Sequence, residues 1–242
     1  MSGKWPGGFI KKTAPTVVGP VDGEGGSASG IWTLDQAADY EQRGLWPMPV
    51  LDKELYAWGR NTYGSLGLGN TTNLSSPVQV GTLTTWSEPA SGLYFSLSTK
   101  TDGTLWSWGD NSYGNLGQGN TTASSSPVQI GIYTTWSKVA AGEDFATAVK
   151  TDGTLWAWGS NSQGQLGNGA TSPNRSSPVQ IGALTNWLDT FSGSSYTLAT
   201  KTDGTLWGWG SNDQGQIGDG TTTQRNSPVQ VGALTTWSKI GT

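Results

Sequence analysis

The side chains that perform most enzyme chemistry are missing from this chain. Its 242 residues include no histidine and no cysteine, so a Ser-His-Asp triad, a Cys-His pair and a thiolate-bound zinc are impossible. The lack of histidine also removes the commonest general base near neutral pH and the commonest ligand of transition metals. A pair of carboxylates of the glycosidase kind is the one acid–base site that remains conceivable. We therefore predict a protein that is not an enzyme and that has no catalytic residues, no metal site and no cofactor.

Three aspartates recur at one position of a repeated sequence, each followed by glycine: Asp102, Asp152 and Asp203. A ring of such carboxylates could bind a cation. However, an Asp-Gly pair between β-forming residues is a strong signal for a two-residue hairpin of type I′, in which both residues take positive φ angles. We expect these aspartates to form turns. The sequence Gly67-Leu68-Gly69 also indicates a turn. A phosphate-binding loop requires a Lys-Ser/Thr pair and a helix after the glycines, and neither follows here.

Polar and aromatic residues at a second repeated position are better candidates for binding. They lie at equivalent places in glycine-rich loops and are Tyr63, Tyr113, Gln163 and Gln214. The alternative is that the amides in these loops satisfy the backbone groups of the loops themselves. Arg175 and Arg225 lie in connections whose sequence varies between repeats, and we expect these two charges to contact a partner.

The binding candidates belong to a sequence unit that is repeated four times in the chain. Its copies centre on Trp58, Trp108, Trp158 and Trp209; three of them read Trp-x-Trp-Gly and the first reads Tyr-x-Trp-Gly, and each continues with a glycine-rich loop and Ser-Pro-Val-Gln. A period near 50 residues that is rich in glycine and aromatic residues is typical of propeller blades. An all-β fold is therefore expected.

One copy of the unit predicts four strands, which in the third repeat are residues 135–140, 145–151, 154–158 and 177–182. In the third of these strands both faces are apolar, so the strand must be covered on both sides. The residue at 157 and its equivalents are small, which predicts a neighbouring sheet packed close to them. We expect the tryptophans that open each first strand to seal seams between blades and not to form exposed platforms for sugars; they are Trp86, Trp136, Trp187 and Trp237.

Composition excludes two classes of partner. Only 12% of the residues are charged, the net charge is −4 and the basic residues are scattered, so the positive surface that nucleic acids require is missing. No apolar run approaches the roughly 20 residues of a membrane span, and the first 20 residues lack the apolar core of a secretory signal. We expect a soluble chain that inserts in no membrane and is not secreted by a cleaved leader.

The sequence before the repeats divides into two parts. Residues 1–30 are rich in glycine and proline, which predicts an extended N-terminal arm. Residues 31–47 predict one short helix and a linker, with the helix at 34–43 between Thr33, a capping residue, and Gly44, a stop. The repeats then fill residues 48–242. On the residues alone, this part reads as a linker and a capping helix that shields one end of the repeats.

The repeated sequence places the chain near a known family. The pattern Gly-x-Leu-Trp-x-Trp-Gly-x-Asn-x-x-Gly-Gln-Leu-Gly-x-Gly of residues 153–169, with Pro-Val-Gln-Ile at 178–181, resembles the RCC1 (regulator of chromosome condensation) repeat and its bacterial alpha-tubulin-suppressor-like relatives. The resemblance covers residues 51–242 and implies four-stranded blades in a β-propeller. Propellers of the family usually have seven blades, whereas this chain has four repeats.

Three arrangements of four blades are open: a small closed ring, an arc, or a larger ring that several subunits complete. The first repeat lacks a first strand, and residues 236–240 form a first strand with nothing after it. We therefore favour closure within one chain, in which the C-terminal strand pairs with the first blade and removes two exposed sheet edges.

A second resemblance concerns the N-terminal part. Residues 30–36, Gly-Ile-Trp-Thr-Leu-Asp-Gln, with Tyr40, Gly44 and Trp46-Pro47, are similar to N-terminal segments of structural and tail proteins of tailed phages, particularly those that infect cyanobacteria. The similarity implies an arm that docks on other virion structural proteins. The apolar residues of this virion-docking arm are Trp5, Phe9, Ile10, Ile31, Trp32, Leu34 and Trp46.

Two hypotheses of function follow. In the first, the chain is a structural protein of a phage virion, made in the host cytoplasm and located on the tail or capsid surface. It would form homo-oligomers in the assembly and display its propeller, as a tail-fibre adhesion or decoration module, toward a host-surface glycan or protein. In the second, it is an RCC1-like regulatory interaction protein of a bacterial cell, of the nucleotide-exchange or scaffold type.

Overall fold

A computed structural model describes residues 54–83, 85–238 and 240, and this part of the chain contains strands and no helix. The predicted arm and the predicted helix at 34–43 lie outside the described residues. The all-β prediction is confirmed. The first two strands, β1 (Tyr56–Gly59) and β2 (Leu74–Gln79), pair with each other in a two-stranded sheet.

Three complete blades follow, each an antiparallel sheet of four strands in chain order. The second blade contains β3 (Trp86–Ser91), β4 (Phe95–Lys100), β5 (Leu105–Gly109) and β6 (Ser124–Gln129). The third contains β7 (Trp136–Ala141), β8 (Phe145–Lys150), β9 (Leu155–Gly159) and β10 (Arg175–Gln180). The fourth contains β11 (Trp187–Ser192), β12 (Tyr196–Lys201), β13 (Leu206–Gly210) and β14 (Arg225–Gln230). The strands predicted for the third repeat are thus confirmed, but β10 begins two residues earlier than predicted, because Arg175 pairs with Gly159 across a bulge.

The Asp-Gly turns are hairpins of a different type from the one predicted. In the third blade Gly153 N–H donates to the Lys150 carbonyl (2.9 Å) and Lys150 N–H donates to the Thr154 carbonyl (3.0 Å), so the loop has three residues. Gly153 has a φ of 77°, and no described residue other than glycine has a positive φ. The hairpin is therefore a three-residue loop with glycine in the left-handed position, and the predicted type I′ turn is wrong.

Asp152 keeps a negative φ in this hairpin because its carboxylate accepts hydrogen bonds from the residue two positions later. Its Oδ1 accepts hydrogen bonds from the Thr154 hydroxyl (2.6 Å) and the Thr154 N–H (3.0 Å). These bonds hold the pKa of Asp152 below its usual value, with the hydroxyl as the larger cause. The equivalent residues Asp102 and Asp203 make the same bonds. The structure thus confirms a turn role for the three aspartates.

The core lies in the seams between blades. Between the third and fourth blades, Leu155, Leu166 and Ile181 of one sheet meet Trp187 and Trp209 of the next. Trp86, Trp136 and Trp187 are each only 3% exposed, which confirms that the first-strand tryptophans seal seams. In each complete blade a lysine packs on one first-strand indole and one third-strand indole, and for Lys150 the ring centroids of Trp136 and Trp156 lie 4.7 and 4.0 Å from Nζ.

The small residue at the middle of each third strand has a cause other than the one predicted. A Cβ atom on Gly208 would lie 2.7 Å from Cγ2 of Ile217, which belongs to the following loop of the same blade. At the equivalent position Ser107 donates to the Leu116 carbonyl of its own loop (2.7 Å). The blade's own loop, which folds back as an apolar plug, therefore limits these side chains, and the prediction of a closely packed neighbouring sheet is wrong for them.

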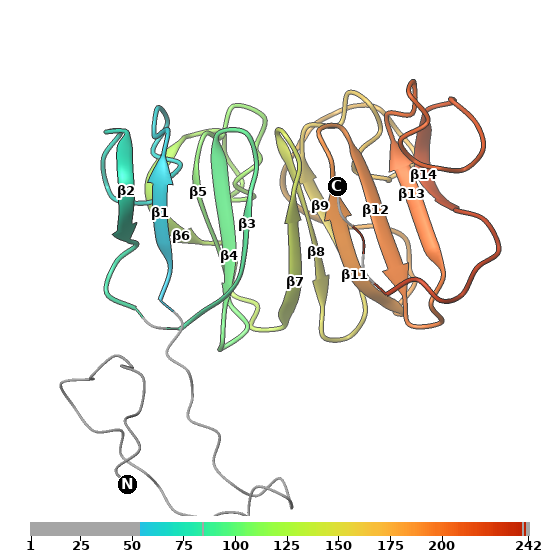
Figure 1. The fold of residues 1–242 in the computed structure, drawn as a ribbon, viewed down its shortest axis with the longest axis horizontal. Coiled ribbons are helices and arrows are strands. Elements are labelled where there is room, and N and C mark those ends of the chain that lie inside the picture. The colour runs from blue at the N-terminus through green and yellow to red at the C-terminus, as the bar shows by residue number, and fades with distance from the viewer. Residues whose placement is uncertain (1–53, 84, 239, 241–242) are drawn as a thin grey trace, which may run out of the picture. The chain divides into compact units, whose positions relative to one another are not determined.

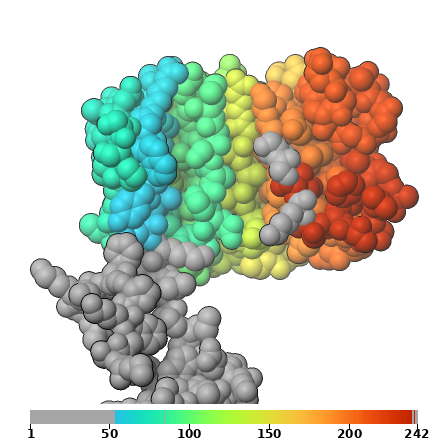
Figure 2. All heavy atoms as spheres, in the orientation of Figure 1, coloured from blue at the N-terminus to red at the C-terminus, as the bar shows by residue number. Residues whose placement is uncertain are grey.

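The blades stand in a row that does not close on itself within one chain (Figure 1). Among the described residues only β2 pairs with β1, so the predicted pairing of residues 236–240 with the first blade is wrong. Trp237 instead donates its N–H to the Gly204 carbonyl (3.2 Å) and packs, with Ile240, on the apolar cluster of the fourth blade. Trp136 and Trp187 donate to the equivalent carbonyls of Gly103 (3.1 Å) and Gly153 (3.0 Å) on the blades before them, so Trp237 takes the place of an internal first-strand tryptophan. Figure 2 shows the first blade and the fourth at opposite ends of one continuous body.

Two glycines with similar backbone angles should respond very differently to alanine. Gly167 (φ 75°) lies under Trp209, whose Nε1 would be 2.6 Å from an added Cβ, whereas Gly182 (φ 66°) has nothing within 4 Å. We expect Gly182→Ala to cost about 1–2 kcal/mol for its left-handed conformation. Gly167→Ala should cost about 1–3 kcal/mol more because it also overpacks the seam. Urea unfolding followed by tryptophan fluorescence measures both, and equal losses would contradict this account of the seam.

Candidate interaction surface

The four glycine-rich loops lie on one rim of the blades. Each joins the third strand of its blade to the fourth, so all four leave their sheets at the same end; they are residues 60–73, 110–123, 160–174 and 211–224. Figure 1 shows them along the upper edge. We call this edge the loop rim. It also carries the turns between first and second strands, because these turns leave the sheets in the same direction.

A buried asparagine holds each loop in shape. Asn111 donates from Nδ2 to the carbonyls of Asn120 and Thr122 (both 3.0 Å), and its Oδ1 accepts from Leu116 N–H (2.9 Å). Asn61, Asn161 and Asn212 bridge the corresponding parts of their own loops. Here the alternative reading is confirmed, since these amides satisfy loop backbone groups. The rim is therefore a set of internally braced loops, which limits the entropy lost on binding.

The predicted binding residues project from these loops. Tyr63 and Tyr113 are each 44% exposed, and Gln163 and Gln214 are also exposed. Each lies on a different blade, so the structure sets the four residues in a line along the loop rim and does not gather them in one cavity. Gln163 alone lines a polar hollow, of about 310 Å³, with Ser195, Asp213 and others at the seam of the third and fourth blades. Their role in binding remains a prediction.

The first–second strand turns add side chains that the sequence analysis did not single out. At the first seam of the rim, Arg60 donates from Nη1 to the Tyr94 hydroxyl (3.2 Å) and stacks 4.8 Å from the centroid of that ring. Tyr63 packs edge-on against the same ring, with 5.3 Å between centroids. This seam therefore presents an aromatic and cationic surface. Tyr94 occupies a turn position whose residue differs in each repeat, and that variation was the available signal.

The second seam of the rim is acidic. Asp144 stands at the turn position equivalent to Tyr94, and burial raises the pKa of its carboxyl, with further contributions from the charges of Glu143 and Asp110. The third seam, around Gln163 and Ser195, is polar and carries Asp213. One backbone frame thus presents three different chemistries along the loop rim.

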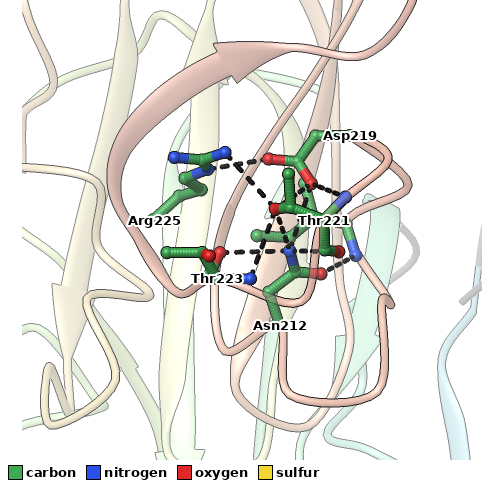
Figure 3. A network of polar contacts seen from close by, with 6 residues as sticks. Asn212, Asp219, Thr221, Thr223 and Arg225 are labelled. Carbon is green, nitrogen blue, oxygen red and sulfur yellow. Dashed lines mark hydrogen bonds and ion pairs between the residues drawn. The ribbon is translucent and has the colours of Figure 1, made fainter.

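Of the two arginines predicted to contact a partner, Arg225 forms an ion pair within its own blade and Arg175 is half-buried. Figure 3 shows Arg225 donating from Nε to Asp219 Oδ2 (2.7 Å), while the Thr221 hydroxyl donates to Asp219 Oδ1 (2.7 Å). The Thr221 hydroxyl and the Arg225 guanidinium lower the pKa of Asp219 to about 2. Arg175 is half-buried at the start of β10, and its Nε has no hydrogen-bond partner among the described residues. Contact of either arginine with another molecule stays a prediction.

Two further properties of the described residues bear on the site. They contain no group of three or more acidic residues placed to hold a metal ion. None of their elements is a helix of the length and apolarity that crossing a bilayer takes. The apolar residues predicted for the virion-docking arm, from Trp5 to Trp46, precede the described part of the chain.

Asp144 and Asp219 should affect stability in opposite directions. A carboxyl whose pKa is raised on folding stabilises the fold only at low pH, so Asp144→Asn should stabilise the protein at pH 7 and change little near pH 3. The pKa of Asp219 falls from 3.8 to about 2 on folding, so its stabilising effect is present above pH 4 and fades toward pH 2. Asp219→Asn should therefore destabilise the protein at pH 7, and its difference from wild type should shrink below pH 4. Urea unfolding at several pH values measures both, and equal signs at pH 7 would be inconsistent with these environments.

The loop, strand and seam pattern can now be compared with known proteins. The family described as "Regulator of chromosome condensation (RCC1) repeat" matches residues 52–98, 102–149, 152–200 and 203–241. A second description of the same repeat matches residues 136–165 and 189–216. No curated protein matches the chain significantly.

Solved structures share the fold. Human WBSCR16 is 24% identical, with a TM-score of 0.69 over 76% of this chain and 49% of that one. Prp20p from Saccharomyces cerevisiae is 19% identical, with a TM-score of 0.65 over 74% of this chain and 46% of that one. The chain thus spans about half the length of these propellers. The family match over four consecutive repeats shows that this chain belongs to the RCC1 repeat family.

Proposed function

We propose that the chain is a non-enzymatic interaction module that binds a macromolecular partner with its loop rim. The observation that carries the proposal is a row of exposed side chains on loops that are themselves rigid. Tyr63 and Tyr113 are 44% exposed, while the asparagines beneath them are fully buried and saturated with hydrogen bonds. Exposed aromatic residues on a preorganised frame are the usual energetic centres of binding surfaces.

The chemistry along the rim favours a large partner over a small ligand. Its aromatic, acidic and polar parts lie on successive seams, and the one hollow that Gln163 lines, of about 310 Å³, is open and polar. Small-molecule sites are usually concave and mostly apolar. A protein or a glycan chain that spans several blades could contact all three parts, with tyrosines stacking on sugar rings or packing on a protein. No cofactor is part of this proposal.

Substitution of the rim residues tests the proposal. A triple variant, Tyr63→Ala, Tyr113→Ala and Gln163→Ala, should lose at least about tenfold in affinity for a partner found by glycan array or by capture from host-envelope proteins. The matched control carries Leu83→Ala, Ile132→Ala and Leu184→Ala, which are 47%, 88% and 49% exposed in the connections between blades, at the opposite end of the sheets. Binding by the control and not by the rim variant is expected. The reverse pattern would place the binding surface elsewhere.

The setting that we propose is a phage virion. It is supported by the similarity of residues 30–47 to N-terminal segments of phage structural and tail proteins, with an arm that docks on other virion proteins and a propeller that faces the host surface. Mass spectrometry of purified particles should detect the chain in them. Its absence from particles, with presence in the infected cell, would favour the regulatory alternative.

The regulatory alternative draws on the neighbours. One solved structure is reported with the binding of Prp20p to Gsp1p and histones, and another with Kap60 bound to yeast RCC1. This chain covers only 46% and 45% of those two chains, so their partners come to it only as an alternative. A small-GTPase binding and exchange assay with the purified chain distinguishes the two settings, and we expect no exchange.

A further inference from the structure

Each seam between blades is made by the same pair of surfaces. The third-strand tryptophan of one blade donates from Nε1 to a loop carbonyl of the preceding blade. The bonds are Trp108 to Ser65, Trp158 to Asn115 and Trp209 to Gln165, each 2.9 Å long. Three backbone bonds accompany them, from Gly69 to Ser125 (2.8 Å), Gly119 to Ser176 (2.7 Å) and Gly169 to Asn226 (2.7 Å). Every seam therefore joins a tryptophan face to a loop-glycine face.

The first blade presents a tryptophan face on which no blade of the described residues packs. Trp58 is 59% exposed, whereas the equivalent Trp108, Trp158 and Trp209 are 2%, 0% and 0% exposed. A hollow of about 270 Å³ lies between the first and second blades, and Trp58 lines it together with Leu66 and Leu97. We call this face, with Ser75 as the equivalent of Ser125, the head.

The fourth blade presents the other half of the seam. Gly67, Gly117 and Gly167 are buried under tryptophans, which would lie 2.6–2.8 Å from an added Cβ, whereas the equivalent Gly218 is exposed. The carbonyl of Gln216 and the N–H of Gly220 are the equivalents of the acceptor and donor at the three internal seams. We call residues 216–220 the tail. Head and tail lie at opposite ends of the row of blades (Figure 1), so one copy cannot join its own two halves in this arrangement.

Charges on the innermost strands have a matching pattern. Glu88 of β3 pairs with Lys138 of β7 (3.3 Å), and Asp189 of β11, in a hollow with both, feels the charges of Lys138 and Glu88. The described charges therefore alternate in sign from blade to blade. The next equivalent position in the sequence, 239, is lysine and lies outside the described residues, and a Glu88 that follows it would continue the alternation in sequence.

We propose that this chain assembles head to tail with a second copy of itself, with Trp58 of one copy seated on Gly218 of the other. Its Nε1 would donate to the Gln216 carbonyl, and Gly220 N–H would donate to the Ser75 carbonyl, as at the internal seams. The blade at each junction is shared: Trp237 and Ile240, at the first-strand position, come from one copy, and β1 and β2 of the other take the third-strand and fourth-strand positions. The second-strand position aligns with residues 46–51, outside the described part.

Two copies joined in this way close a ring. Each copy brings three complete sheets and its part of two shared ones, so the ring has about eight blades, within the usual range of propellers. Closure leaves neither a bare tryptophan face nor a bare loop face. This inference is independent of the partner proposed for the loop rim.

Mass measurement of the purified full chain, by light scattering or native mass spectrometry, tests the proposal. We expect a dimer. Trp58→Ala should weaken it by roughly 30-fold or more, because an interface tryptophan with a buried hydrogen bond is lost. Gly218→Ala should weaken it as strongly, because its Cβ would meet the partner's Trp58. Gly182→Ala, a glycine of similar φ with open space around it, and Ile132→Ala should leave the dimer intact.

A mixing experiment determines the polarity of the contact. Trp58→Ala and Gly218→Ala chains are each expected to be monomeric, but their mixture should give a dimer with one intact junction. A head-to-head contact would survive Gly218→Ala, and a tail-to-tail contact would survive Trp58→Ala; either result overturns the proposal. A wild-type monomer, or a dimer that neither substitution affects, also overturns it. Circular dichroism confirms that each variant is folded.

Discussion

The rest of the fold depends on one contact, in which a tryptophan ring packs on a loop glycine of the preceding blade. A single four-stranded sheet of this kind has apolar residues on both faces and cannot bury them alone. The ring of Trp158 covers Gly117 in the loop of the preceding blade, and its Nε1 donates a hydrogen bond to the Asn115 carbonyl of the same loop (2.9 Å), so one residue provides burial and a fixed register together. Because Gly117 has no side chain, the ring can lie against the loop backbone, and any Cβ would separate the sheets.

The repeat made most of this fold predictable from sequence. Four copies of one pattern gave the strands, their order within each blade and the role of Trp136 and its equivalents at the seams. The details that failed are those in which a local polar contact overrides a propensity. Asp152 was expected at a positive φ because Asp-Gly favours it, but its carboxylate bonds to Thr154 and keeps the chain in the commoner region. The small third-strand residue was assigned to a neighbouring sheet because a pattern of strands says nothing about a loop that folds back.

The candidate surface was predictable only in part, for a related reason. The loop position of Tyr63 and its equivalents stands out because it follows a fixed motif. Tyr94 and Asp144 occupy the turn between first and second strands, where no residue type recurs, and only the meeting of two blades brings them to the same rim. Arg225 shows a related limit: this charge in a variable connection was expected to contact a partner, and the structure adds an ion pair with Asp219, six residues earlier, that the sequence did not indicate. A position whose residue type differs between repeats is not required by the shared fold. That variation does not by itself distinguish a residue that contacts a partner from one that forms an internal ion pair.

Closure was mispredicted because the sequence shows which strands are missing and not how far apart the ends of the row lie. Each seam fixes the angle between two sheets, and the sum of three such angles decides whether the first and last blades meet. In a repeat protein the interactions are between nearest neighbours, so the tail end of the chain follows the same rule as every other blade. Trp237 therefore packs on the fourth blade, as Trp187 packs on the third. For the same reason Trp58 and Gly218 are exposed at the two ends of the row, because each has the surface of an internal seam and no neighbouring blade among the described residues.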